Sequence, residues 1–119
     1  MGVTKLKKAE ANPAFIGRWQ IYEMSEWDED YFNMEIQAYI SIQADNSGDF
    51  QFGLVSGYLD GYLEKLENEE RFTFTWEGQD EMDEASGNGW LELNGDDEVE
   101  GVIEFQMGDR STFQAKKVS

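Results

Sequence analysis

Carboxylates and tryptophans are the residue types in this chain that could bind a ligand or carry out chemistry. Acidic side chains cluster in Trp27-Asp28-Glu29-Asp30 and in Asp80-Glu81-Met82-Asp83-Glu84, and Gly108-Asp109-Arg110 adds one acid and one cation. Clustered carboxylate oxygens are ligands for calcium and magnesium, and Trp27 could cover the mouth of an apolar pocket. Two carboxyl groups whose pKa values differ could also catalyse hydrolysis by acid and base.

Most other catalytic and metal sites need residues that this chain lacks. Histidine and cysteine are both absent, which excludes thiolate catalysis, serine–histidine pairs, disulfides, and imidazole or thiolate metal sites. The spacing Asp80-Glu81-x-Asp83-Glu84 is not that of an EF-hand, and no particular pair of carboxylates is singled out. We therefore expect a non-enzymatic protein without a cofactor. A divalent-cation site is the alternative, and turn capping with a bidentate pair from Arg110 to another loop is the structural explanation.

The net charge of −17 restricts the partners of the protein. It results from 26 acidic and 9 basic residues, a balance that repels phosphate backbones and anionic lipids. We therefore expect no direct nucleic-acid binding and no membrane attachment, and a basic protein becomes a candidate partner. No apolar run has the length of a membrane span and no signal peptide is recognisable, which predicts a cytoplasmic protein. The oligomeric state is left open.

Alternation of apolar and polar residues predicts the elements that would hold these side chains. From Tyr31 to Ala44 one parity is apolar and the other polar, which is typical of one long strand with a buried face. The same alternation predicts seven further strands, of which the one over 58–66 could also be a helix. The longest irregular connection is expected over 78–89. The further strands are predicted over 15–24, 49–55, 58–66, 71–76, 90–93, 98–107 and 110–117.

These elements predict an all-β fold. No helical crossover separates the strands, so neighbouring strands should be antiparallel. An eight-stranded up-and-down barrel of the calycin type is expected, with a two-sheet sandwich as the alternative. Residues 1–13 are predicted to form a flexible tail and residues 14–119 a single domain. Because nearly all phenylalanines share the inward parity, much of the interior should be packed with rings.

Several motifs resemble known barrels. Gly17-Arg18-Trp19 resembles the Gly-x-Trp opening of the calycins, which include the lipocalin, fatty-acid-binding and avidin-like barrels. Between residues 15 and 117 the chain is similar to a family of small bacterial proteins of unknown function, although it is acidic where that family has several basic or neutral residues. The resemblance implies a bacterial cytosolic barrel, and the likeness to lipocalins implies a small apolar ligand. It is carried by Trp27-Asp28-x-Asp30, Phe52-Gly53-x-Val55-x-Gly57, Trp76-x-Gly78-x-Asp80-Glu81, Ser86-Gly87-x-Gly89-Trp90 and Gly108-Asp109-x-Ser111-x-Phe113.

The up-and-down order predicts where a site would lie. Alternate connections emerge at opposite ends of such a barrel, so the first, third, fifth and seventh connections should share one rim. We expect a small apolar or aromatic ligand there, with a basic protein partner as the alternative. Trp76 and Trp90 also suit structural packing. The candidate ligand-binding residues are Trp27, Asp28, Asp30, Trp76, Asp80, Glu81, Trp90, Asp109 and Arg110.

Overall fold

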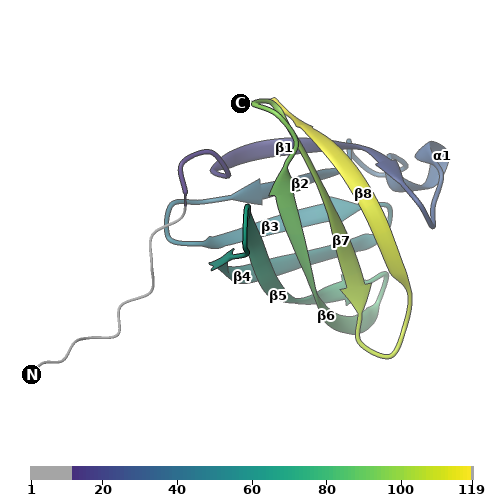
Figure 1. Ribbon diagram of the computed structural model, residues 1–119. Helices are drawn as coiled ribbons and strands as arrows, with labels where there is room; N and C mark the ends of the chain where they lie inside the picture. The colour runs from purple at the N-terminus through teal and green to yellow at the C-terminus, as the bar shows by residue number, and fades with distance from the viewer. Residues whose placement is uncertain (1–11, 119) are drawn as a thin grey trace, which may run out of the picture.

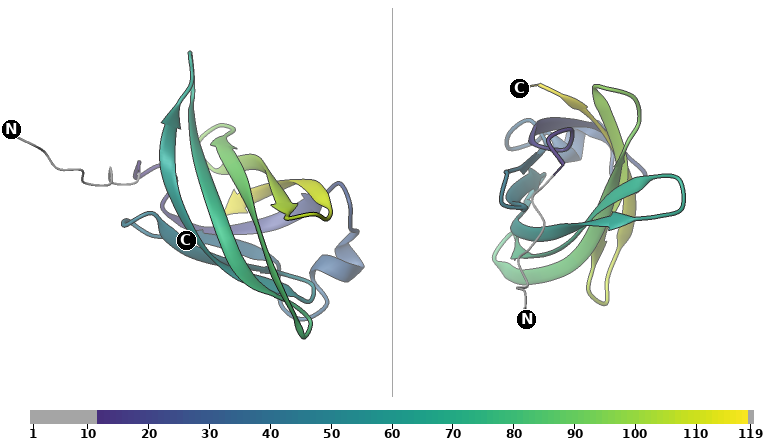
Figure 2. Two further views of the ribbon diagram at one scale, coloured as in Figure 1. Left: turned by 90° about the horizontal axis from the view of Figure 1, so that it is seen from below. Right: turned by 60° about the vertical axis from the view of Figure 1, so that its left-hand side comes forward.

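Eight antiparallel strands form a closed barrel in the computed structural model, which describes residues 12–118 (Figure 1). Each strand pairs with the next in sequence, and β8 pairs with β1 to close the ring, as the right-hand view of Figure 2 shows. The predicted up-and-down barrel is confirmed, and the sandwich alternative is wrong. Residues 1–11 of the predicted tail lie outside the described residues. The strands are β1 (Gly17–Met24), β2 (Tyr39–Ile42), β3 (Ser47–Phe52), β4 (Val55–Lys65), β5 (Glu70–Asp80), β6 (Asp83–Leu93), β7 (Glu98–Phe105) and β8 (Arg110–Lys117).

The predicted long strand over 31–44 is wrong in its first half. The end of the short helix α1 (Glu29–Phe32) and the irregular segment 33–38 take its place, and β2 begins only at Tyr39. The Asp28 carboxylate accepts a hydrogen bond from the Tyr31 amide at 3.2 Å, and two acids occupy the first turn. These features stabilise a helix N-terminus, so local capping prevails over the two-residue alternation. Among the described residues no helix is long and apolar enough to cross a membrane.

The predicted irregular stretch over 78–89 is also wrong, because it forms the ends of two long strands. β5 continues to Asp80, and β6 begins at Asp83 after the two-residue turn Glu81-Met82, in which Glu81 has a φ of 63°. Glycines and polar residues on both parities hide the alternation there. The turn between β3 and β4 lies at 53–54, whereas the predicted strands placed it at Ser56-Gly57. β4 therefore starts at Val55, and it is a strand, not a helix.

Aromatic rings fill the barrel and lie against inward-facing glycines of neighbouring strands. A Cβ on Gly61 would lie 2.5 Å from Cζ of Phe72, and one on Gly89 would lie 2.7 Å from Cζ of Phe74. A Cβ on Gly57 or Gly87 would approach the indole of Trp76 to 2.9 Å. Such a ring shields the glycine backbone of the adjacent strand and occupies the volume that a side chain would need.

The interior is consequently packed rather than hollow. Trp19 and Phe15 close the end near the chain's start, and the Trp19 indole N–H donates to the Phe15 carbonyl at 2.9 Å. At the other end Phe50 meets Trp76 edge to face, with ring centroids 5.1 Å apart. The largest fully buried side chains are Trp19, Trp76, Phe15, Phe32, Phe50, Phe52, Phe72, Phe74, Ile40, Ile42, Leu91 and Val55. A ligand should therefore be sought on the surface of the barrel.

Substitution of an inward glycine tests this packing. Gly61→Ala places its Cβ 2.5 Å from the Phe72 ring and 2.7 Å from the Thr73 carbonyl oxygen. We expect the free energy of unfolding in urea to fall by about 1–3 kcal/mol, the usual cost of overpacking. Gly108→Ala is the milder comparison, because its Cβ would approach Phe105 Cβ to 3.1 Å in an exposed turn, and it should therefore cost less than Gly61→Ala. Equal stability of both variants and the unmodified protein would contradict a tightly packed interior.

Candidate functional site

Four connections meet at the end of the barrel that carries α1, as the strand order predicts. They are the segments 25–38, 53–54, 81–82 and 106–109. Backbone hydrogen bonds join each connection, or the strand beside it, to its neighbour, so the rim is a closed and preorganised ring. These bonds run from Gly53 N to Phe32 O (2.9 Å), from Glu81 N to Leu54 O (2.9 Å), from Gln106 N to Ser86 O (2.8 Å) and from Ser25 N to Thr112 O (3.1 Å).

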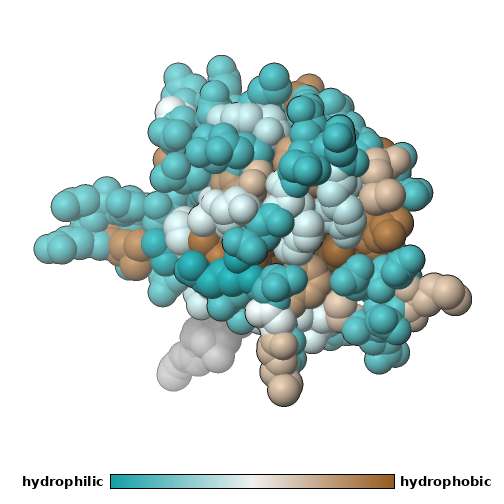
Figure 3. Space-filling view, turned by 90° about the vertical axis from the view of Figure 1, so that its right-hand side faces the viewer, coloured by the Kyte–Doolittle hydropathy of each residue, from teal (hydrophilic) through white to brown (hydrophobic). Residues whose placement is uncertain are grey.

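A hollow of about 330 Å³, here called the rim pocket, opens between these connections. Its size is at the lower end of the range for small-molecule sites. Figure 3, in which the end carrying α1 faces the viewer, shows hydrophilic side chains over most of this face and apolar ones between them. The rim pocket is lined by Trp27, Tyr31, Val55, Asp80, Asp83, Glu84, Ala85, Ser86, Phe105, Gln106, Gly108 and Asp109.

Three aromatic side chains form the apolar wall of the rim pocket. Trp27 stacks on Tyr31 with centroids 6.1 Å apart and meets the edge of Phe105 at the same distance. The Tyr31 hydroxyl accepts a hydrogen bond from the Leu54 amide at 3.3 Å. Gly53, with a φ of 58°, leaves room for this ring, because a Cβ there would lie 2.3 Å from it. The neighbouring turn thus fixes the position of the wall.

The charges that line the rim pocket all have one sign. Asp80, Asp83, Glu84 and Asp109 contribute carboxylates, and no lysine or arginine is among the described residues that line it. Asp80 and Asp83 lie directly opposite each other across the hairpin, an arrangement in which like charges repel. Within residues 12–118 no group of three or more acidic side chains is placed so that it could hold a metal ion.

The structure places the predicted site residues in two groups. Trp27, Asp80 and Asp109 line the rim pocket, whereas Asp28 caps α1, Asp30 is exposed in its first turn, and Glu81 forms the hairpin turn.

Trp76 is buried, and its indole N–H donates to the Glu104 carbonyl at 3.2 Å. Trp90 lies under the guanidinium of Arg71 at 3.9 Å, outside the rim. The ion-pair partner of Arg110 among the described residues is Glu104, its cross-strand neighbour at 3.7 Å, rather than a carboxylate of another loop.

Tyr31 and Phe105 are pocket residues that the sequence did not identify as such. Tyr31 was expected on the polar face of a strand, and Phe105 within the barrel interior. Phe105 is the last residue of β7, and its ring contacts both Trp27 and Trp76, at 6.1 and 5.2 Å. An apolar residue at a strand end that faces the rim is the signal that could have identified Phe105.

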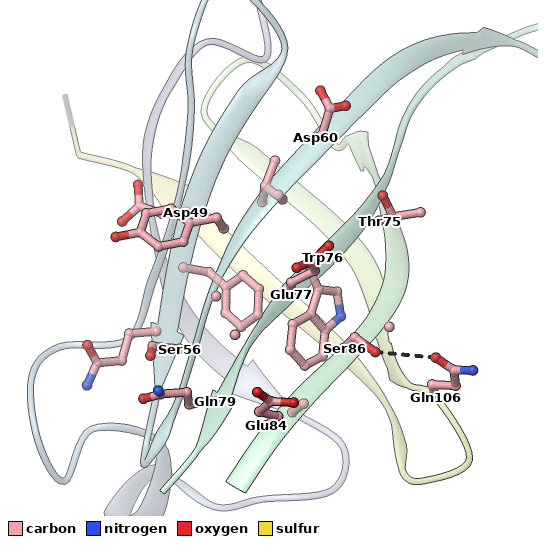
Figure 4. Close-up of a pocket in the computed structure, with 18 of the residues that line it drawn as sticks. Asp49, Ser56, Asp60, Thr75, Trp76, Glu77, Gln79, Glu84, Ser86 and Gln106 are labelled. Atoms are coloured by element: carbon pink, nitrogen blue, oxygen red, sulfur yellow. Dashed lines mark hydrogen bonds between the residues drawn. The ribbon is translucent and has the colours of Figure 1, made fainter. Parts of the chain in front are cut away.

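A second and larger hollow, here called the outer groove, crosses the outside of β3, β4, β5 and β6. It has a volume of about 1440 Å³ and is open to solvent. One carboxylate stands on each of the four strands, Asp49, Asp60, Glu77 and Glu84, and Figure 4 shows them spread around Trp76. Figure 4 also shows the hydrogen bond of 3.3 Å from the Ser86 hydroxyl to Gln106 at one side of the groove.

Tyr39 provides a polar contact at the edge of the outer groove. Its hydroxyl donates to the Asp49 carboxylate, and the guanidinium of Arg18 lies 3.7 Å from the centre of its ring. Burial, followed by the hydrogen bond to Asp49, raises the pKa of Tyr39 to about 12. The side chain is therefore a neutral donor at physiological pH.

Comparison with known proteins identifies no family for this chain. No protein-family model matches the chain, and neither a curated protein nor a solved structure matches it. The resemblance to a family of small bacterial barrels is therefore carried no further than the closed eight-stranded antiparallel barrel itself.

The raised pKa of Tyr39 predicts a loss of stability at alkaline pH. Its folded pKa of about 12 exceeds the unfolded value near 10, so this group's contribution is complete below pH 10 and is lost as the pH rises toward 12. We expect Tyr39→Phe to lose less stability than the unmodified protein between about pH 9 and pH 11. Urea unfolding at both pH values measures this, and parallel losses would contradict the assignment.

Proposed function

We propose that this protein is a non-enzymatic binding barrel that holds the cationic group of an apolar or aromatic ligand in the rim pocket. The observation that carries the proposal is the combination of an aromatic wall with charges of a single sign. Trp27, Tyr31 and Phe105 supply the wall, and Asp80 and Asp109 are among the carboxylates around it. An apolar wall alone would suit a neutral ligand, whereas this pair of features favours an organic ammonium or guanidinium.

The physical basis is the attraction of a cation to both features. The face of a tryptophan ring carries partial negative charge and attracts an ammonium or guanidinium by about 0.5–1 kcal/mol when exposed and about 2 kcal/mol when desolvated. Nearby carboxylates add Coulomb attraction, and the same carboxylates repel anionic ligands. The packed interior supports this location, because rings occupy the space in which a lipocalin-type ligand would lie.

The side chains around the rim pocket support binding rather than catalysis. Ser86 and Tyr31 bring hydroxyl groups to its lining, and each is engaged in a hydrogen bond, Ser86 to Gln106 and Tyr31 to the Leu54 amide. The chain contains no histidine or cysteine that could act as a base or nucleophile beside them. In these hydrogen bonds neither hydroxyl is paired with a carboxylate that could remove its proton, so the pocket is better suited to recognition.

A second candidate function, recognition of a basic protein, is favoured by the outer groove. Its lining includes four carboxylates and, among the described residues, no lysine or arginine. The net charge of −17 attracts a basic partner over long range.

Binding of a matched pair of probes tests the first proposal. We expect 4-phenylbutylamine to bind at least about tenfold more tightly than 4-phenylbutan-1-ol, a difference of about 1.4 kcal/mol, by titration calorimetry. Trp27→Ala should weaken the amine and the alcohol together. The double variant Asp80→Asn/Asp83→Asn should weaken only the amine.

The opposite rim provides the control for this experiment. Asp96 and Asp97 lie in the connection between β6 and β7, at the other end of the barrel. Asp96→Asn/Asp97→Asn removes the same charge there and should leave the affinity for the amine within about twofold. Equal affinities for amine and alcohol, or equal losses in both double variants, would show that no cation site exists at the rim.

A further inference from the structure

We infer that the rim pocket and the outer groove form one continuous site for a basic polypeptide segment. In this arrangement one lysine or arginine side chain of the partner enters the rim pocket, and its backbone runs along the outer groove. The inference rests on the proposed function of the rim pocket and identifies the kind of molecule that carries the cation.

The two hollows share part of their lining. Glu84, Ala85, Ser86 and Gln106 line both the rim pocket and the outer groove. The rim pocket, at about 330 Å³, has room for one side-chain head group and its stem. The outer groove, at about 1440 Å³, exceeds the range of about 300–1000 Å³ that is usual for small-molecule sites. A small pocket that opens into a long groove fits an anchored chain better than a free small molecule.

The charge of the combined surface selects a basic occupant. Asp49, Asp60 and Glu77 extend the acidic lining of the rim across β3, β4 and β5. No lysine or arginine lines either hollow within the part of the chain that the structure describes. A nucleic acid would be repelled by this surface. A segment with several lysines or arginines would be attracted at each strand that it crosses.

Exposed apolar side chains along the path provide contact area. Tyr58, on the outer face of β4, is 79% exposed, and Met107, beside the rim pocket, is 99% exposed. Tyrosines are frequent at the energetic centre of protein interfaces, and methionine adapts to varied partners. Arg18 already lies 3.7 Å from the Tyr39 ring, which shows that a guanidinium can pack on an aromatic side chain at this edge.

The closed barrel determines how such a segment would bind. Where the outer groove crosses β3, β4 and β5, these strands are paired on both sides, so their backbone there cannot accept an added strand. The partner must therefore be recognised through side chains. Gln51, Ser56 and Gln79 lie within the groove and can exchange hydrogen bonds with the partner's backbone. Affinity should depend on the charge of the partner's side chains rather than on strand pairing.

A labelled peptide tests the inference. The probe is a fluorescein-labelled peptide of alternating arginine and glycine, about eight residues long and therefore about 26 Å when extended. The control peptide carries citrulline, which is neutral and nearly the same shape, in place of arginine. At about 150 mM salt we expect fluorescence anisotropy to show binding of the arginine peptide at least about tenfold tighter than that of the citrulline peptide.

Variants of the protein distinguish the groove from general attraction. Tyr58→Ala/Glu77→Gln should weaken the arginine peptide by about tenfold or more while leaving the affinity for 4-phenylbutylamine unchanged. Tyr62→Ala/Glu100→Gln is the matched control, since it makes the same changes at exposed positions outside both hollows. It should change peptide affinity by no more than about twofold. Trp27→Ala should weaken both the peptide and the amine, and thermal unfolding confirms that each variant is folded.

The outcomes separate the two proposals. Equal losses in the groove variant and its control, with the amine still bound at the rim, would overturn the groove and leave the rim site in place. If the unmodified protein does not bind the amine, and all variants bind the peptide equally, both the rim site and the groove would be overturned. Amide chemical shifts that change only along β3 to β6 and at the rim would support the continuous site, and shifts spread over every strand would overturn it.

Discussion

The packing of aromatic rings against glycines of adjacent strands is the constraint on which the rest of this barrel depends. The rings of Phe72, Phe74 and Trp76 occupy the positions where side chains of Gly61, Gly89 and Gly87 would otherwise point. Because the rings fill this volume, the interior is solid, and the strands can approach closely without a hollow. The proposed binding site accordingly lies at the surface and the rim rather than in the interior.

The rim pocket is the exposed end of this packed interior. Ring contacts run without interruption from Phe50 through Trp76 and Phe105 to Trp27, with centroids 5.1–6.1 Å apart. The acidic residues that turn the chain at this end surround the last of these rings. A site that joins apolar and anionic surface thus results from two ordinary requirements, a filled core and polar turns.

The sequence predicted the barrel and its shared rim because alternation is strong where one face is fully buried, as in β5 from Arg71 to Trp76 and in β8. It failed where a second signal competed. Asp28 and the acids after it favour α1 over a strand, and glycines such as Gly78 and Gly87 conceal the β5–β6 hairpin. For the site, Trp27, Asp80 and Asp109 were identified from the order of connections. Tyr31 and Phe105 were not identified, because their positions depend on the helix and on the end of β7.

A filled interior and a proposed cationic ligand at the rim make opposite predictions from a hollow barrel about where an aromatic amine binds. Crystals grown with 4-bromophenethylamine test these predictions directly, because the anomalous signal of bromine marks the aromatic end of the ligand without prior assumption about its position. We expect a bromine peak beside Trp27 and Phe105, with the amine directed toward Asp80 or Asp109. A peak inside the barrel, among Phe50, Phe72 and Phe74, would contradict both the packed interior and the site at the rim.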